Sequence, residues 1–182
     1  MSIAVHRRRS VPRAMQYYIA LGSNLGEREA TLRQGWAMCS AFCSEMMLSP
    51  LYETRPMYVV DQPLYLNAVG RVSCAIQPID LLDRLHRIEK ELGRDRAKEA
   101  RMGPRTLDLD ILLCGDRIQD DPMLTIPHPR IKERMFVLVP LLALAPRLHD
   151  PRTGVPYADS LALLQSDDEV TRAGGVYLYS SG

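Results

Sequence analysis

Alternating apolar and polar residues predict short β-strands in several parts of the chain. In residues 16–24, Ile19 and Leu21 alternate with Tyr18 and Ala20, so the two pairs should face opposite sides of a sheet. An apolar run that contains two aspartates predicts another strand within residues 103–115. Two more strands are predicted over residues 46–53 and 65–75.

Apolar residues at helical spacing predict two amphipathic helices between these strands. Pro78 should begin the clearer helix and Gly93 should end it. Ser23 or Asn24 should cap the earlier one, with Glu27 and Glu29 in its first turn. The buried positions of the clearer helix would be Leu82, Leu85, Ile88 and Leu92. Those of the earlier helix would be Leu25, Leu32, Trp36, Cys39 and Cys43.

The C-terminal third of the chain is predicted to hold a strongly apolar helix and weaker elements after it. The apolar helix spans residues 135–144, and Pro140 inside it predicts a kink or a late start. A short helix is expected over residues 157–164, and residues 173–182 should be frayed. The inward positions of the apolar helix are expected to be Phe136, Val139, Leu142 and Ala143.

The order strand, helix, strand, strand, helix, strand predicts an α+β fold, a ferredoxin-like sandwich. Its sheet should be mostly antiparallel, with helices on both sides. A chain of 182 residues fits one domain with a sizeable core. We expect a basic, disordered extension over residues 1–15, the domain over 16–166 and a C-terminal tail over 167–182.

Asp108 and Asp110 lie two residues apart in the last predicted strand, so both should point to one face of the sheet. Two carboxylates about 6–7 Å apart along a strand repel each other and lose water, unless cations compensate for their charge. Hard oxygen ligands suit Mg²⁺, whereas the alternative is a pair of solvated acids on an edge strand. The opposite, buried face should carry Leu107, Leu109, Ile111 and Leu113.

A basic loop leads directly into this strand. Five basic residues and only two acidic ones occur in it, and a solvated charged loop is the alternative interpretation. Cations beside carboxylates are what a nucleoside triphosphate requires, because its negative charge must be held and neutralised. The basic residues are Arg94, Arg96, Lys98, Arg101 and Arg105.

Other polar residues are placed to complete such a site. Tyr65 and Asn67 share one face of a strand and would suit a planar heterocycle, although a half-buried tyrosine commonly serves packing alone. His128 is held between two prolines and is either a phosphate donor or a surface histidine. His86 and Glu89 lie on one flank of the clearer helix and point toward the basic loop.

The overall composition is that of an ordinary globular protein. A net charge of +1 argues against a broadly basic nucleic-acid-binding surface. No run of 18 apolar residues predicts a transmembrane helix, and the basic N-terminal segment lacks the apolar centre of a signal peptide. The four cysteines form no CxxC pair, so we expect reduced thiols in a cytoplasmic protein.

Five segments resemble the 6-hydroxymethyl-7,8-dihydropterin pyrophosphokinase family of folate biosynthesis, and the resemblance covers about residues 18–164. It implies transfer of the β,γ-pyrophosphoryl group of ATP to the hydroxymethyl group of the pterin, with release of AMP. It also implies a cytoplasmic monomer with ATP and the pterin as partners and with neither nucleic acid nor membrane. The segments are YIALGSNLG, YETRPMYVVDQPLYLNA, RIEKELGR, GPRTLDLDILL and LTIPHPRIKERMFVLVPL.

The resemblance also implies roles for individual residues. Two Mg²⁺ ions would be held by Asp108 and Asp110. Catalysis would involve these two and Arg94, Arg96 and Arg105. The ATP site would comprise His86, Glu89, Arg94, Arg105, Ile111, Thr125, His128 and Arg134. The pterin site would comprise Thr54, Arg55, Pro56, Met57, Tyr65, Asn67 and Phe136, with the ring held between Tyr65 and Phe136. Met102 departs from the family pattern, in which a known member has tryptophan.

Two rival classes of function stay open on the sequence alone. One is a different metal-dependent phosphoryl or nucleotidyl transferase that uses the same aspartates, and a simple kinase would release ADP rather than AMP. The other is a non-catalytic binding module, because ferredoxin-like domains also bind RNA or amino acids. Aromatic residues make up only 6% of the chain and no strand carries an aromatic platform, which argues against RNA.

Overall fold

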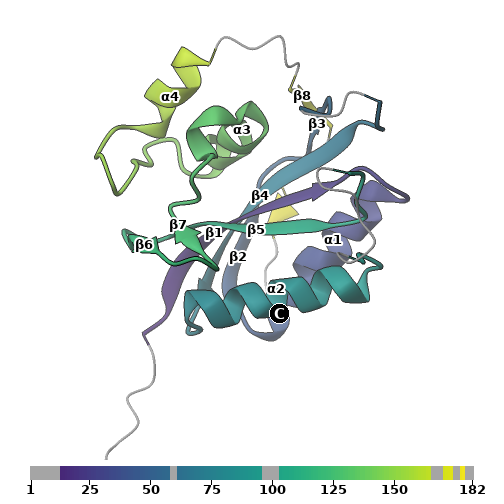
Figure 1. The fold of residues 1–182 in the computed structure, drawn as a ribbon, viewed down its shortest axis with the longest axis horizontal. Coiled ribbons are helices and arrows are strands. Elements are labelled where there is room, and N and C mark those ends of the chain that lie inside the picture. Colours follow the sequence, from purple (N-terminus) through teal and green to yellow (C-terminus); the bar gives the residue numbers. More distant parts are fainter. Residues whose placement is uncertain (1–12, 58–60, 96–102, 165–169, 174–176, 179–182) are drawn as a thin grey trace, which may run out of the picture.

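An antiparallel sheet with helices on both faces forms most of the protein, as a computed structural model shows (Figure 1). The structure describes residues 13–57, 61–95, 103–164, 170–173 and 177–178. The main strand order is β5 (Asp108–Cys114), β1 (Met15–Ser23), β4 (Tyr65–Cys74), β2 (Ser44–Leu48) and β9 (Tyr177–Leu178), while β3 (Tyr52–Thr54) pairs with β4 and with β8 (Thr171–Arg172). A separate two-stranded sheet is formed by β6 (Gln119–Asp120) and β7 (Thr125–Ile126), and every pair among the described strands is antiparallel. This arrangement confirms the predicted α+β fold.

The predicted elements are recovered with small changes in their bounds. The strands are β1 Met15–Ser23, β2 Ser44–Leu48, β3 Tyr52–Thr54, β4 Tyr65–Cys74, β5 Asp108–Cys114, β6 Gln119–Asp120, β7 Thr125–Ile126, β8 Thr171–Arg172 and β9 Tyr177–Leu178. The helices are α1 Arg28–Met38, α2 Pro78–Glu91, α3 Met135–Leu144 and α4 Tyr157–Leu163, with the 3-10 turns η1 Cys39–Ala41 and η2 Ile131–Glu133. No helix of the described residues is long and apolar enough to cross a membrane.

The sheet separates two apolar cores. Helices α1 and α2 cover one face, and α3 and α4 lie over the other (Figure 1). Ile19 of β1 and Trp36 of α1 are fully buried in the first core. Tyr18 of β1 and Leu138 of α3 belong to the second. The alternation predicted for the first strand is therefore confirmed, since its neighbouring residues enter different cores.

Alternation along β5 breaks at a bulge. Ile19 of β1 pairs with Ile111, but Tyr18 pairs with Leu113, so Leu112 is an extra residue on β5. Leu113 consequently packs in the core under α3, whereas Ile111 packs in the core over α1 and α2. The expectation that Leu113 shares the face of Ile111 was wrong.

Helix α3 buries a different face from the one predicted. Every residue of this helix is apolar, so hydrophobic periodicity alone does not select a buried side. Contacts with β4 and α4 select it instead. Its buried residues are Val137, Leu138, Pro140 and Leu141, while Ala143 is exposed and Phe136, Val139 and Leu142 are partly buried.

Two stretches differ from the sequence expectation at the sheet edges. The single strand expected over residues 46–53 is divided into β2 and β3, and Ser49 between them exchanges backbone and side-chain hydrogen bonds with Val69. Residues 173–182 were expected to be frayed, but β9 lies within them and pairs with β2. The proposed division into extension, domain and tail stays a prediction, and residues 1–12 lie outside the described residues.

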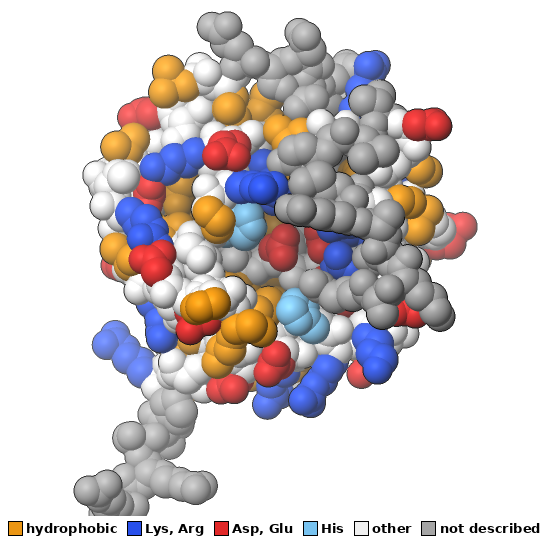
Figure 2. All heavy atoms as spheres, in the orientation of Figure 1, with side chains coloured by type: hydrophobic (Ala, Val, Ile, Leu, Met, Phe, Trp, Pro, Cys, Tyr) orange, Lys and Arg blue, Asp and Glu red, His pale blue; other side chains and the backbone are white. Residues whose placement is uncertain are grey.

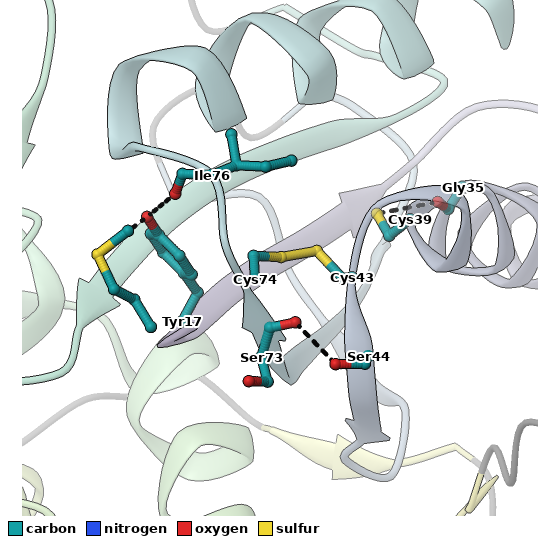
Figure 3. Close-up of a disulfide and its surroundings, with 9 residues drawn as sticks. Tyr17, Gly35, Cys39, Cys43, Ser44, Ser73, Cys74 and Ile76 are labelled. Atoms are coloured by element: carbon teal, nitrogen blue, oxygen red, sulfur yellow. Dashed lines mark hydrogen bonds between the residues drawn. A yellow bond between two sulfur atoms is a disulfide. The ribbon is translucent and has the colours of Figure 1, made fainter. Parts of the chain in front are cut away.

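A disulfide joins Cys43, just before β2, to Cys74 at the end of β4 (Figure 3). Their Cα atoms are 4.7 Å apart, and 31 positions separate the two residues in sequence. Cys39 and Cys114 are free and buried. The expectation of four reduced thiols was therefore wrong for this pair, because the chain reversal before β2 brings Cys43 beside the neighbouring strand rather than onto the helix of Cys39.

We expect reduction of the disulfide to destabilise the protein without unfolding it. Closing a loop of this length stabilises the native state by about 3–4 kcal/mol in the chain-entropy model. For a chain of this size that corresponds to a fall in Tm of roughly 10 °C. Calorimetry with and without a reductant measures the change in Tm. The Cys43→Ser/Cys74→Ser double variant is the control, and it should melt at one temperature in both buffers. A wild-type Tm that is the same with and without the reductant would show that the disulfide does not stabilise the protein.

Candidate active site

A cavity of about 300 Å³ opens on the α3 face of the sheet, where β1, β4 and β5 meet. Strand residues form its floor, Phe136 and Val137 of α3 form one side, and residues 54–57 form another. Figure 2 shows acidic side chains near the middle of the molecule in this view, flanked by basic and histidine side chains. The cavity therefore combines both charge signs with an apolar wall.

Two small residues of the central strand make room for this cavity. Gly22 pairs with Asn67 on one side and with Asp108 on the other, and Ala20 pairs with Asp110. A Cβ atom at Gly22 would lie 3.1 Å from the Asn67 Oδ1 atom. The missing side chain at Gly22 thus leaves open the space between the amide and the carboxylates.

Asp108 is held by two arginines. Arg105 Nη1 donates to Asp108 Oδ2 at 2.9 Å, and Arg94 Nη1 donates to Asp108 Oδ1. Arg94 is itself only 7% exposed. Burial opposes ionisation of Asp108, but the charges of Arg105 and Arg94 outweigh it and hold its pKa below the usual value. Asp108 is consequently a carboxylate at neutral pH.

Glu89 of α2 holds Arg94 and the start of β5 in place. Its Oε1 atom accepts hydrogen bonds from Arg94 Nη1 at 2.6 Å and from the Leu109 backbone N–H at 2.8 Å. The side chain of Glu89 is completely buried, so it does not line the cavity. An ion pair within a protein interior requires such further hydrogen bonds to offset desolvation. Glu89 thus fixes the end of α2, the start of β5 and the guanidinium of Arg94 relative to one another.

Asp110 has the opposite electrostatic balance. Burial, together with the charges of Asp108 and Glu89, raises its pKa to about 6, and Arg134 and Arg94 offset only part of the increase. No described hydrogen bond or ion pair to the Asp110 carboxylate accompanies these charges. A carboxylate that stays uncompensated in this way favours a bound cation.

The two aspartates fit Mg²⁺ as a ligand set. Mg²⁺ commonly takes one or two protein carboxylates and completes its octahedron with water and phosphate oxygens. Within the described part of the chain, no group of three or more His, Cys, Asp or Glu residues is arranged to hold a metal. The site therefore suits an ion that shares its coordination sphere with a substrate, rather than a closed structural metal centre.

Asn24 ties the loop of Arg105 to the end of β1. Its Oδ1 atom accepts the Arg105 backbone N–H at 2.7 Å, and its backbone N–H donates to the Arg105 carbonyl at 3.1 Å. Its side-chain amide donates to Gln62 Oε1 at 3.1 Å. The expectation that Ser23 or Asn24 caps the following helix was wrong, since Glu27 occupies the cap position and makes no side-chain cap.

The seven residues assigned to the pterin all lie together. Asn67 Nδ2 donates to Thr54 Oγ1 at 2.7 Å, and both side chains are buried. Tyr65 donates to the Gly103 carbonyl at 3.4 Å, which orients its ring beside the cavity. All seven line the cavity: Thr54, Arg55, Pro56, Met57, Tyr65, Asn67 and Phe136.

The residues assigned to ATP divide into two groups. Arg94, Arg105 and Arg134 line the cavity, and the Arg134 guanidinium stacks over the Phe136 ring at 5.6 Å from its centroid. Ile111 is buried in the core over α1 and α2. Arg96 lies outside the described residues. Those that do not line the cavity are His86, Glu89, Ile111, Thr125 and His128.

His128 lies next to the cavity in a fixed, neutral form. Its backbone N–H donates to the Leu112 carbonyl at 2.8 Å, which fastens this segment to β5. The Arg130 N–H donates to its Nδ1 atom at 3.2 Å, so the proton of the neutral ring is on Nε2. Burial, together with the charges of Arg134 and Arg130, lowers the pKa of His128 to about 4.

Sequence reasoning missed several residues that shape the site. Gly22 and Ala20 have no reactive side chains, and the only sequence feature that could indicate them is a small residue at two alternate positions of a strand. Asn24 and Gln62 act through contacts between distant loops, which no local pattern reveals. Arg130 lies within a matched segment but was not singled out, although it lines the cavity.

Comparison with known proteins identifies relatives over most of the chain. The model of the family 7,8-dihydro-6-hydroxymethylpterin-pyrophosphokinase matches residues 18–146. The 2-amino-4-hydroxy-6-hydroxymethyldihydropteridine pyrophosphokinase of Pseudomonas aeruginosa is 45% identical over 139 residues, which are 74% of this chain and 83% of the relative. That of Bacillus subtilis is 43% identical over 138 residues, 75% of this chain and 81% of the relative.

Longer relatives contain a corresponding part. The folic acid synthesis protein fol1 of Schizosaccharomyces pombe is 42% identical over 166 residues, which are 90% of this chain and 21% of the relative. The crystal structure of Plasmodium falciparum HPPK-DHPS wild type with pteroate superimposes with a TM-score of 0.64 at 15% identity, over 82% of this chain and 42% of that one. The chain thus spans only a fifth of the fol1 protein, and the likeness to the Plasmodium structure concerns the fold alone.

We expect Asp110→Asn to be more stable than the wild type at pH 7.5. A carboxylate whose pKa is raised on folding loses stability as the pH rises from the unfolded value near 4 to the folded value of about 6. A folded-state pKa one pH unit above the unfolded value costs about 1.4 kcal/mol once the group is ionised, so the gain should be about 1–3 kcal/mol. Denaturant unfolding without metal, at pH 4 and pH 7.5, measures it.

The control for this measurement is Asp116→Asn, an exposed acid in the turn after β5. Its stability should follow that of the wild type at both pH values. An Asp110→Asn variant that is no more stable than the wild type at pH 7.5 would show that Asp110 is already compensated in the free protein.

Proposed function

Because the chain belongs to the 7,8-dihydro-6-hydroxymethylpterin-pyrophosphokinase family, we propose that it transfers pyrophosphate from ATP to the hydroxymethyl group of 6-hydroxymethyl-7,8-dihydropterin. The products are the pterin diphosphate and AMP. It is an ATP-dependent transferase, a pyrophosphokinase of folate biosynthesis. The observation that carries the proposal is the identity of 42–45% to bacterial pyrophosphokinases over about three quarters of this chain.

The proposal covers one reaction only. The chain matches more than four fifths of each bacterial pyrophosphokinase named above, but a fifth of the fol1 protein. Any further activity of the longer relatives belongs to segments that this chain does not match. The cavity supports this reaction because one of its walls is aromatic and suits a pterin, while the other is charged and suits ATP with Mg²⁺.

The pterin half of the site is the wall of Tyr65, Phe136 and the Asn67–Thr54 pair. A flat bicyclic ring gains stacking energy from an aromatic face on each side. Its polar edge requires donors and acceptors, and the hydrogen bond between Asn67 and Thr54 fixes the amide in one orientation. Gly22 supplies the space in which that edge approaches Asn67.

The ATP half of the site is the aspartate pair with the surrounding arginines. We propose that Asp108 and Asp110 would hold two Mg²⁺ ions, whose charge would neutralise that of the polyphosphate. Arg94 and Arg105 hold phosphate oxygens from the Asp108 side, and Arg134 does so from the α3 side. Glu89 and His128 act behind them: Glu89 orients Arg94, and His128 presents a neutral N–H donor.

The chemical step needs positioning more than acid–base catalysis. The pterin hydroxyl attacks the β-phosphorus of ATP in line and loses its proton to solvent. The bond between the β-phosphorus and the oxygen that bridges to the α-phosphorus breaks, and AMP leaves with that oxygen. Charge that develops on the phosphoryl oxygens is stabilised by guanidinium groups already fixed in place. Water must be kept from the bound reactants during this step, because it would otherwise hydrolyse ATP.

The remaining assignments are proposals about the setting of the enzyme. We propose that it acts in the cytoplasm as a monomer, with neither nucleic acid nor membrane as a partner. The two Mg²⁺ ions per site, and the contribution of Arg96 to catalysis, belong to the same proposal.

The products formed from ATP distinguish the proposed reaction from its rivals. Incubation of the protein with ATP, Mg²⁺ and the pterin should yield AMP and the pterin diphosphate in equal amounts, as measured by anion-exchange chromatography. Release of ADP would indicate a simple kinase, and binding of ATP without turnover would indicate a binding module.

Asp110→Ala should lower the rate by at least about a thousandfold, and the control Asp116→Asn should keep wild-type activity.

A side chain at Gly22 should selectively weaken pterin binding. Gly22→Ala places a methyl group 3.1 Å from Asn67 Oδ1, so the amide must shift by a few tenths of an ångström and the methyl group fills space beside it. A displaced amide and a narrower floor should raise the Kd for the pterin about tenfold. Calorimetric titration in the presence of a non-hydrolysable ATP analogue measures it. Affinity for the analogue alone should change less than about twofold, and an equal loss of both affinities would contradict the assignment of this floor to the pterin.

A further inference from the structure

Arg130 is a cavity-lining cation to which the sequence motifs assign no role. Five arginines line the cavity: Arg55, Arg94, Arg105, Arg130 and Arg134. Arg130 precedes the η2 turn and Arg134 precedes α3, whereas Arg94 follows α2 and Arg105 precedes β5. The side chain of Arg130 is half-buried, so part of its stem is already removed from solvent.

The backbone that carries Arg130 is anchored at three points. The His128 N–H donates to the Leu112 carbonyl on β5, two residues beyond Asp110. Ile131 is buried, and its N–H donates to the His128 carbonyl at 3.2 Å. Lys132 forms an ion pair with Asp150, whose carboxylate is almost completely buried. A guanidinium on such a segment is presented to the cavity from a fixed origin and loses less conformational freedom when it binds a ligand.

Cationic charge gathers in two places around the aspartate pair. Arg94 and Arg105 form ion pairs with carboxylates in the free protein. Arg130 and Arg134 lie close enough to His128 to oppose its protonation, and Arg134 also lowers the pKa of Asp110. Two guanidinium groups and a neutral imidazole on one side of a cavity make a site that attracts an anion.

We propose that Arg130 binds a phosphate oxygen of ATP in the part of the cavity beside His128 and Arg134. The planar guanidinium suits this role because it contacts two phosphate oxygens at once, whereas an ammonium group contacts them as a point charge. Arg130 also holds the Nδ1 atom of His128 through its backbone N–H, so the arginine and the Nε2–H donor of His128 form one unit. The inference rests on the proposed function for the identity of the anion as ATP.

The test measures binding of α,β-methylene-ATP with Mg²⁺ by calorimetry, because this analogue is not cleaved at the bond that the reaction breaks. Arg130→Gln should raise its Kd about tenfold, and it should raise the KM for ATP in parallel. Arg130→Lys should restore affinity to within about threefold of the wild type. The Kd for the pterin should stay within about twofold for both variants, because Arg130 belongs to the segment before η2 and not to β4, which carries Tyr65 and Asn67.

Arg147→Gln is the matched control, an exposed arginine beyond the end of α3. It should leave analogue and pterin binding unchanged. Each variant is also melted, since a Tm equal to that of the wild type shows that the η2 turn is intact. The dependence of the analogue Kd on salt concentration should be weaker for Arg130→Gln than for Arg147→Gln, because one cation–phosphate contact is missing.

Several outcomes would overturn the inference. Analogue affinity of Arg130→Gln within about twofold of the wild type would remove Arg130 from the ATP site. Equal losses of analogue and pterin affinity, without rescue by Arg130→Lys, would assign Arg130 a structural role. The proposed function fails separately: a wild-type protein that makes no AMP but binds the analogue through Arg130 would keep the phosphate site and lose the pyrophosphokinase reaction.

Discussion

Two carboxylates that share one face of a strand impose the main electrostatic constraint on this protein. Asp108 and Asp110 cannot both be ionised beside a packed sheet unless positive charge surrounds them. The protein compensates one of them with Arg94 and Arg105 and leaves the other with a pKa of about 6. This unequal compensation retains a place for cations. Complete pairing of both acids would give a more stable free protein whose site no longer attracts Mg²⁺.

The architecture follows from the need to hold these charges without closing the cavity. Ala20 and Gly22 have small side chains, so the centre of the sheet leaves space for the cavity. Glu89, from the opposite face, accepts hydrogen bonds from Arg94 and from the backbone of β5 and so fixes the position of Arg94. Asn24 then binds the Arg105 loop to the end of β1. Each of these polar groups is oriented by an element that packs in one of the two cores. The positions of the charged side chains in the site are therefore fixed mainly by the sheet rather than by the loops that surround it.

The sequence predicted what repeats and what is chemically unusual. Alternation in β1 and helical spacing in α2 have clear periods, and the Asp108–Asp110 pair stands out in an apolar run. The bulge at Leu112 and the buried face of α3 were not predictable, because bulges depend on pairing register and a uniformly apolar helix has no preferred side. The Cys43–Cys74 disulfide was not predicted for a similar reason, since it joins neighbouring strands through a chain reversal. Contacts between distant loops, such as Asn24 with Arg105, leave no trace in local spacing.

Strand β4 separates stability from chemistry along its length. Its first residues, Tyr65 and Asn67, belong to the cavity, and its last residue, Cys74, belongs to the disulfide. Seven residues of extended chain span roughly 23 Å, so loosening one end need not disturb the other. Between them, Val69 and Val72 pack into opposite cores and hold the middle of the strand in place whether or not the sulfurs are joined. Reduction of the disulfide would therefore remove stabilisation at the far end of β4 while the floor of the cavity keeps its geometry.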